Sequence, residues 1–230
     1  MINLFGMKKI TVKNLIQFRG KNERTKITFV HNLKKEKEKS DDSSGGDYWI
    51  SSLSAIRNSF KYDDKTLLDE KIELLRDKIS VTEIKRIKDQ FQRNIEIVNS
   101  FKDYDLSHLK PNTEIIFIKQ VKTNSLLKIK ELPIEAKPCH VFTFSESKSE
   151  EIGGVWFIAK LNGFEKSELG MFADILYRYL DKHYSKDFYV NPDYCIAVDL
   201  YNAQEINYSD IKNGEIPILI DSTIDDLKKT

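Results

Sequence analysis

Apolar side chains recur every three or four residues between positions 48 and 101, which is the period of helices that bury one face. The pattern predicts three helices, over residues 48–60, 65–79 and 83–101. The third carries the longest apolar stripe, whose members are Ile84, Ile87, Phe91, Ile95, Val98 and Phe101. Because a sustained coiled coil needs about three or four heptads, we expect this shorter stripe to pack on a sheet or a sister helix, with Phe91 and Ile95 in the core.

After residue 112 the pattern changes to that of strands. Residues 113–121 and 126–132 flank a short polar stretch and predict a hairpin. Residues 139–144 predict a further strand. Residues 155–161 are continuously apolar, which predicts a central strand that is buried on both faces.

The next two elements predict a crossover. Residues 166–184 repeat apolar positions at helical spacing, and residues 194–201 form another apolar strand. A strand, a helix and a second buried strand predict a right-handed parallel crossover. Further on, residues 204–208 and 216–220 suggest edge strands or irregular structure, because Pro217 cannot donate to a central ladder.

The first 46 residues have a different character. Residues 10–16 and 27–30 cluster β-branched side chains on either side of a basic turn, which predicts a small strand pair or an extended arm. Residues 34–46 contain no apolar side chain, so they predict a flexible linker or an exposed loop.

Together these elements predict a mixed α/β fold, with a sheet of about five or six strands covered by helices. We expect a basic N-terminal arm over residues 1–33, a polar linker over residues 34–46 and a main domain over residues 47–230. Within the main domain, residues 47–110 are expected to be helical and residues 111–230 to contain the sheet. A chain of 230 residues can fold around a single core.

Several general features favour a cytoplasmic protein. No apolar run approaches the roughly 20 residues that cross a bilayer, so we expect no membrane partner. The first six residues lack the basic and apolar regions of a secretory signal. Cys139 and Cys195 lie in apolar, strand-like segments that suit buried free thiols. The abundance of Lys, Asn and Ile is typical of an AT-rich, bacterial coding genome.

The formal net charge of +1 conceals an uneven distribution. Residues 1–39 hold 11 Lys and Arg against 3 acidic residues, whereas residues 131–230 hold 10 against 18. A basic segment attracts phosphates by releasing counterions, and rings placed among the cations can stack on bases. The candidate nucleic-acid-binding residues are Phe18, Arg19, Lys21, Arg24 and Lys26. The alternative is that this segment docks on the acidic half of the chain or is a solvated face, with Phe18 packed inward.

Signatures of catalysis and of metal binding are missing from the sequence. It has no glycine-rich phosphate loop, no HExxH, no paired CxxC and no GxSxG, so no reaction class is indicated. The histidines, His31, His108, His140 and His183, are scattered and favour surface or packing roles. We therefore expect no catalytic residue, no metal and no cofactor.

One alternative involves a nuclease-like site around Lys160. A helix, antiparallel strands, a crossover helix and a final strand occur in the order of the PD-(D/E)XK nuclease core. Those enzymes need an acid two residues before a lysine so that carboxylates can hold Mg²⁺. Lys160 would be that lysine, but the acid position holds Ile158, and Glu150 and Glu151 are the nearest candidate carboxylates. The other match to the spacing, Glu135 before Lys137, lies between two prolines, where a regular strand is doubtful.

The leading hypothesis is a non-enzymatic interaction protein, an accessory subunit that contacts nucleic acid or a protein partner through its basic N-terminal segment. The many tyrosines also suit a protein interface, either with a partner or in a homo-oligomer. The alternatives are the divergent PD-(D/E)XK-like nuclease and a purely structural adaptor.

Overall fold

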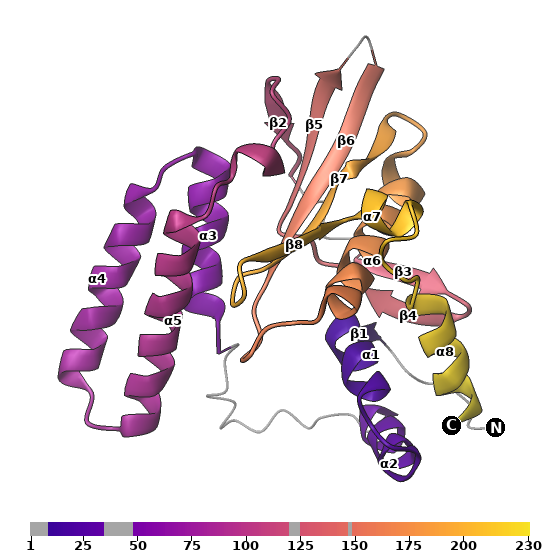
Figure 1. Ribbon diagram of the computed structural model, residues 1–230, viewed down its shortest axis with the longest axis horizontal. Coiled ribbons are helices and arrows are strands. Elements are labelled where there is room, and N and C mark those ends of the chain that lie inside the picture. The colour runs from indigo at the N-terminus through magenta and orange to yellow at the C-terminus, as the bar shows by residue number, and fades with distance from the viewer. Residues whose placement is uncertain (1–8, 35–47, 120–124, 147–148) are drawn as a thin grey trace.

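A five-stranded mixed sheet lies between helical layers in the computed structural model, which describes residues 9–34, 48–119, 125–146 and 149–230 (Figure 1). The strands in spatial order are β2 (Ile115–Phe117), β5 (His140–Glu146), β6 (Ser149–Ile158), β7 (Tyr189–Asp199) and β8 (Gln204–Asn207). β6 and β7 run parallel, and the other neighbours are antiparallel. The predicted mixed α/β fold is confirmed.

β6 is the central strand that its apolar run predicts. Every residue from Glu151 to Ala159 is buried. The strand begins earlier than predicted, at Ser149, because the glycines also belong to it: Gly153 pairs with β5, and Gly154 pairs with both β5 and β7. A Cβ on Gly153 would lie 2.6 Å from the Cβ of Tyr194, and one on Gly154 would lie 2.9 Å from the carbonyl oxygen of His140. Glycine therefore permits the close approach of the three strands.

The helix α6 (Lys166–Tyr184) has the bounds that its periodicity predicts. It connects the parallel strands β6 and β7, so the predicted parallel crossover is confirmed. A capping box fixes its start, because Glu165 and Glu168 each accept a hydrogen bond from the other's backbone N–H. α6 covers one face of the sheet, where Leu176 and Leu180 are buried.

Three helices cover the opposite face of the sheet and confirm the three helical predictions (Figure 1). They are α3 (Ile50–Tyr62), α4 (Thr66–Val81) and α5 (Lys85–Asp103), followed by the 3-10 turn η1 (Ser107–Leu109). Phe60 and Phe101 pack edge-on against Phe157 of β6, with ring centroids 5.3 and 5.5 Å apart. Ile95 lies in this core as expected, whereas Phe91 is half-buried at its margin beneath Lys78.

The helical layer is also held at the edge strand β8. Tyr104, after α5, donates a hydrogen bond to Glu205 of β8, and His108 Nε2 lies 2.7 Å from the same carboxylate oxygen. Burial and the neighbouring carboxylate raise the pKa of Tyr104 above its ordinary value. These contacts join two segments that lie almost a hundred residues apart in the sequence.

The expected N-terminal strand pair is wrong, because that segment forms two helices. After the two-residue strand β1 (Ile10–Thr11) come α1 (Val12–Arg19) and α2 (Glu23–Lys34). Thr11 and Asn14 form a capping box that starts α1. The β-branched residues that suggested strands also fit a helical period and bury one side of α1. The predicted linker 34–46 lies outside the described residues except for Lys34.

The expected hairpin between residues 113–121 and 126–132 is also wrong. β2 pairs with β5, and the second segment forms its own hairpin of β3 (Leu126–Ile129) and β4 (Leu132–Glu135). Lys130 and Glu131 make the turn with φ values of 45° and 65°. β1 joins β4 in parallel, which gives a separate three-stranded sheet on the α6 side of the core.

The C-terminal segment contains two helices beyond the predicted elements, α7 (Tyr208–Lys212) and α8 (Ile220–Lys229). Residues 216–219 are irregular, one of the two outcomes that Pro217 suggested. Arg178 of α6 ties α8 to the core, because it donates to Asp174 at 2.7 Å and to Asp221 at 2.5 Å. No helix within the described ranges combines the length and the apolar character that spanning a bilayer requires.

Candidate anion-binding pocket

A cavity of about 230 Å³ lies at the carboxyl end of β6, where the central sheet, the three-helix layer and the small sheet meet. In open α/β sheets, ligands bind beyond the carboxyl ends of parallel strands. We call this cavity the basic pocket. Its lining residues are Thr11, Val12, Lys13, Leu53, Arg57, Glu135, Lys137, Trp156, Phe157, Ile158 and Phe172.

The floor of the basic pocket is aromatic and dry. Trp156 of β6 packs edge-on against Phe172 of α6, with ring centroids 5.3 Å apart, and Phe157 and Ile158 complete the floor. All four side chains are at most 8% exposed. Because few water molecules can approach from below, charges on the walls are screened less than at an open surface.

Lys13 enters the pocket from the start of α1. Pairing of β1 with β4 fixes this segment beside the end of β6. Thr11 caps α1, so Lys13 is the second residue of the helix. Lys13 is half-buried, and its Nζ lies 3.4 Å from the carbonyl oxygen of Ala159. No carboxylate in the described part of the chain forms an ion pair with this ammonium group.

Arg57 enters from α3, on the opposite wall. Its Nε donates a hydrogen bond to Cys139 Sγ at 3.1 Å, and its carbonyl oxygen lies 2.9 Å from His140 Nε2. The side chain is half-buried. Among the residues that the structure describes, no carboxylate pairs with the Arg57 guanidinium group. The pocket therefore contains two half-buried cations without a counter-charge.

Glu135 is the carboxylate in the pocket lining, and it is already engaged. Lys9 and Lys137 approach its Oε1 at 2.6 and 2.7 Å. Burial opposes ionisation of Glu135, but the hydrogen bonds from the two lysines outweigh it and hold its pKa below the ordinary value. The pocket lining thus holds one carboxylate and three cations, Lys13, Arg57 and Lys137, so its net charge is positive, and Lys9 binds the carboxylate as a residue outside the lining.

His140 adds no charge at neutral pH. Burial lowers its pKa to about 4, and the positive charge of nearby Arg57 acts in the same direction. The ring stacks on Phe60, with centroids 5.8 Å apart, which is the packing role expected for the histidines. Cys139 and Cys195 are both free, and burial raises the pKa of each thiol.

The candidate nucleic-acid-binding residues of the basic segment lie on α1, on α2 and, for Lys21, in the turn between them, at the lower end of the molecule in Figure 1. Phe18 is 1% exposed, so its ring offers no face to a base, and Lys26 Nζ lies 5.1 Å from its centroid. Arg19 donates to Thr223 of α8, and Lys21 lies over the ring of Phe29. Arg24 is exposed. These side chains largely serve the packing of the N-terminal helices.

The residues of the nuclease alternative are not brought together. Glu150 and Glu151 lie at the amino end of β6 and Lys160 lies beyond its carboxyl end, so the extended strand separates them by roughly 30 Å. Glu151 is buried and accepts hydrogen bonds from Ser149 and Asn191. In the described ranges no group of three or more His, Cys, Asp or Glu side chains could hold a metal ion.

Lys160 instead belongs to a structural cluster at the start of α6. Its Nζ lies 3.0 Å from Glu168 Oε2 and 4.6 Å from the ring centre of Phe164. The neighbouring Asp199 is buried and accepts hydrogen bonds from the backbone N–H groups of Phe164 and Tyr201. Burial raises the pKa of Asp199 despite these bonds. Glu168 and Asp199 therefore have structural contacts in this cluster, Glu168 with Lys160 and Asp199 with the backbone of two loops.

Sequence reasoning missed the pocket residues Lys13, Arg57 and Lys137. Arg57 occupies an ordinary polar position on an amphipathic helix, and Lys137 lies in an irregular segment between prolines. No spacing links residues that come from three distant segments. The strongest local signal is Lys13, because it belongs to the basic N-terminal segment that composition singled out.

Comparison with known proteins gives no relative from which to transfer a function. No protein-family model matches the chain, and neither any curated protein nor any solved structure matches it significantly.

Proposed function

We propose that this chain is a non-enzymatic nucleic-acid-binding protein that seats one backbone phosphate in the basic pocket. The observation that carries the proposal is the pair of half-buried cations, Lys13 and Arg57, without a carboxylate partner in the described residues. Charges that leave water without a counter-charge cost free energy, and a bound anion offsets that cost. Arginine and lysine are the side chains that contact phosphates in nucleic-acid complexes.

The size of the pocket favours a compact group. Its volume of about 230 Å³ is below the roughly 300 Å³ at which small-molecule sites begin, so it would hold a phosphate group and not an entire larger ligand. The aromatic floor is buried and offers no open stacking face, so we assign the pocket to the backbone of the nucleic acid and not to its bases.

The surroundings of the pocket favour a polymer over a free phosphate ion. Lys9 and Lys137, whose side chains are 53% and 62% exposed, both contact Glu135 of the pocket lining. Exposed cations beside an occupied phosphate seat can contact the adjoining phosphates of the same strand. Binding through four cations predicts a steep dependence on salt, with a slope of roughly −3 in log K against log salt for single strands.

The test is a salt series of fluorescence anisotropy with labelled single-stranded DNA and RNA. The variant carries Lys13→Gln and Arg57→Gln, because glutamine retains a donor for Ala159 and Cys139. We expect the affinity to fall and the magnitude of the salt slope to decrease by about 1.4, which corresponds to two lost phosphate contacts. Thermal unfolding checks that the variant retains its fold.

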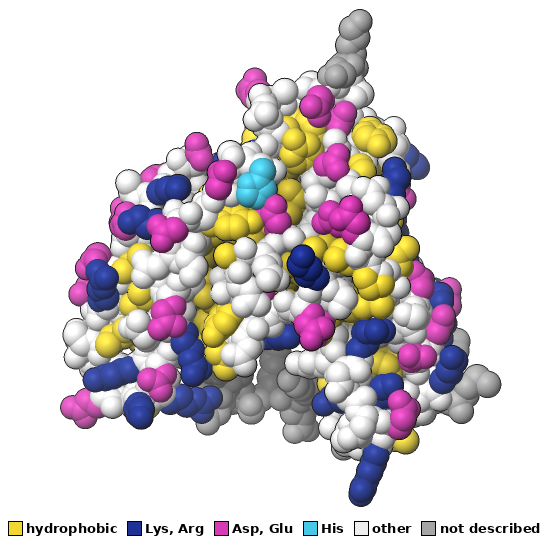
Figure 2. All heavy atoms as spheres, in the orientation of Figure 1, with side chains coloured by type: hydrophobic (Ala, Val, Ile, Leu, Met, Phe, Trp, Pro, Cys, Tyr) yellow, Lys and Arg dark blue, Asp and Glu magenta, His cyan; other side chains and the backbone are white. Residues whose placement is uncertain are grey.

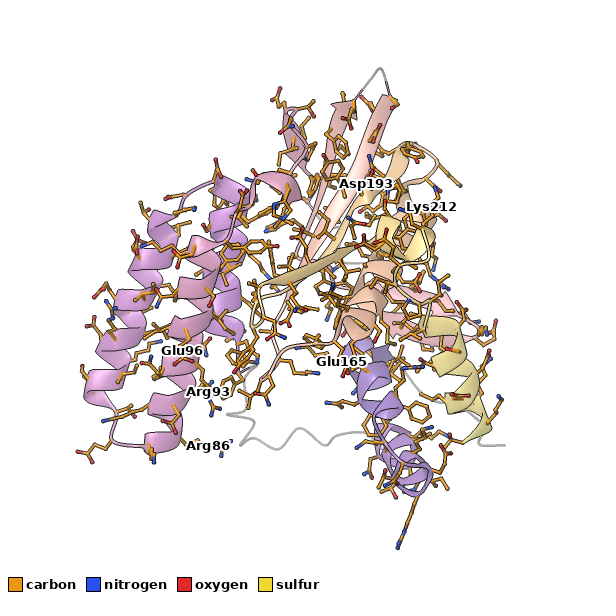
Figure 3. All side chains as sticks on the ribbon, in the orientation of Figure 1. Arg86, Arg93, Glu96, Glu165, Asp193 and Lys212 are labelled. Carbon is orange, nitrogen blue, oxygen red and sulfur yellow. The ribbon has the colours of Figure 1, made fainter. Side chains whose placement is uncertain are left out.

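The matched control removes two lysines elsewhere. Lys182 and Lys212 are exposed, and Lys212 lies on α7 at the upper right of Figure 3, far from the lower end of the sheet. The control variant, Lys182→Gln with Lys212→Gln, should bind as the wild type does. The proposal is wrong if the wild type does not bind at low salt, or if both variants weaken binding equally. Competition by inorganic phosphate alone, at concentrations that do not act as salt, would identify a free-anion site instead.

A further inference from the structure

The opposite end of the central sheet presents an open apolar face with an acidic rim. β5 and β6 extend beyond the end of α6 (Figure 1), and a concavity of about 380 Å³ lies there. We call it the acidic face. Its lining residues are Thr113, Glu114, Ile116, Thr143, Phe144, Ser145, Glu150 and Phe188.

The apolar part of the acidic face includes a side chain that nothing in the described chain covers. Ile116 is 65% exposed although it belongs to the sheet. The register places it beside Thr143, on the same side of the sheet as Ser145 and Glu150. Phe188, before β7, borders the same concavity. The exposed Ile116 and the half-buried Phe188 thus give this concavity an apolar part on which a partner side chain could pack.

β2 also offers unused backbone groups, because it is the edge strand of the sheet. Ile118 donates its backbone N–H to the carbonyl oxygen of Val141 at 2.9 Å. Hydrogen-bonded residues alternate along an antiparallel strand, so Ile116 pairs toward β5, while Ile115 and Phe117 direct their N–H and C=O groups to the open edge. Such an edge can be extended by another strand.

The charge of the rim determines which partner can bind to the acidic face. Glu114, Glu146 and Glu150 are exposed, and no Lys or Arg in the described ranges pairs with them. Lys148, between Glu146 and Glu150 in the sequence, lies outside the described residues. Figure 2 shows that acidic and apolar side chains dominate the upper part of the visible face, whereas Lys and Arg gather lower down. Polyanions are disfavoured here by like-charge repulsion.

We propose that the acidic face binds an extended, lysine- or arginine-bearing segment of a partner protein, which adds a strand to β2 and places aliphatic side chains against Ile116. A second copy of the chain is a poorer occupant. A two-fold interface would bring the acidic rim of one copy against the acidic rim of the other, and like charges in contact oppose association.

The test uses a short synthetic peptide of alternating lysine and valine, titrated into the isotope-labelled full chain and followed by backbone amide shifts. We expect shifts along β2 and β5. Glu114→Gln with Glu150→Gln should weaken binding roughly two- to thirtyfold, the range set by two exposed ion pairs. Ile116→Asp should abolish binding, and Leu74→Asp, on an exposed apolar residue of α4, should leave it unchanged.

Two control peptides separate charge from strand pairing. Replacing lysine by glutamate should eliminate binding through the rim, and replacing alternate valines by proline should eliminate backbone pairing. The inference is overturned if the lysine peptide shifts no amide of β2 or β5, or if the chain is a dimer that Ile116→Asp dissociates. The variant Lys13→Gln with Arg57→Gln should bind the peptide normally, so this result is independent of the proposed nucleic-acid site.

Discussion

The two ends of the central sheet differ in charge and in the use of their apolar residues. At the carboxyl end of β6, three cations and one carboxylate line a pocket above a buried floor, and Lys9 binds that carboxylate. At the other end, carboxylates surround Ile116, which remains exposed. Figure 3 marks this separation, with Glu165 at the start of α6 below and Asp193 of β7 above.

The difference follows from how the layers cover the sheet. Three separate parts of the chain converge on the lower end, so each contributes a side chain to a closed pocket. At the upper end, β5 and β6 extend past the end of α6 (Figure 1). Convergence at the lower end brings together the half-buried cations Lys13 and Arg57, whereas incomplete coverage at the upper end leaves an open strand edge. One sheet can therefore support two unlike contacts.

The largest expected effect is on the free energy of unfolding, from a substitution in β6, the strand that runs between the two ends of the sheet. Phe157→Ala removes a ring packed against Phe60 and Phe101, so it should lower the free energy of unfolding by about 3–5 kcal/mol. Ile116→Ala, at the exposed edge, should change it by less than about 0.5 kcal/mol. Urea unfolding of both variants measures the contrast. Equal losses would show that the edge is as well packed as the centre.

A smaller effect is the pH dependence of stability that His140 should produce. In the folded protein, burial keeps the pKa of His140 near 4, whereas an unfolded histidine titrates at about 6.5. The unfolded state therefore binds a proton first as the pH falls. Stability that is fully present above pH 6.5 should decline toward pH 4, by up to about 3 kcal/mol.

Urea unfolding at pH 7 and at pH 4.5 isolates this contribution. His140→Gln keeps a donor for the Arg57 carbonyl group and cannot titrate, so its stability should depend less on pH than that of the wild type. His31 is exposed on α2, and His31→Gln should retain the wild-type pH dependence. If both variants show the wild-type slope, His140 is not the group responsible.

The smallest expected effect is on nucleic-acid affinity, from removing the carboxylate of the basic pocket. Glu135→Gln removes the negative charge that competes with phosphates for Lys9 and Lys137, so nucleic-acid affinity should rise severalfold. Glu131→Gln is the matched control, because it removes a lysine-paired carboxylate from the β3–β4 turn. Anisotropy titrations should detect a gain for the first variant alone. A gain for both would indicate a diffuse effect of net charge.

Local sequence patterns predicted the elements whose burial they encode. The bounds of α6 and the buried course of β6 follow from continuous apolar spacing, because such a pattern can be satisfied by one kind of element in one orientation. The N-terminal segment was predicted wrongly because its pattern is ambiguous. Its β-branched residues at positions 10–16 satisfy both periods, and the capping box at Thr11 decides in favour of a helix.

Which strands pair, and which distant side chains meet in the basic pocket, depended on the tertiary structure. Nothing local distinguishes β5 from the 126–132 segment as the partner of β2, because both present alternating apolar faces. The basic composition of the N-terminal segment pointed toward anions, but it did not place Lys13 beside Arg57. By itself, the sequence determined the helices α3 to α6 and the buried strands β6 and β7, but not α7 and α8. Only the tertiary structure decided which charges meet, since a pocket assembled from distant segments leaves no periodic signal along the chain.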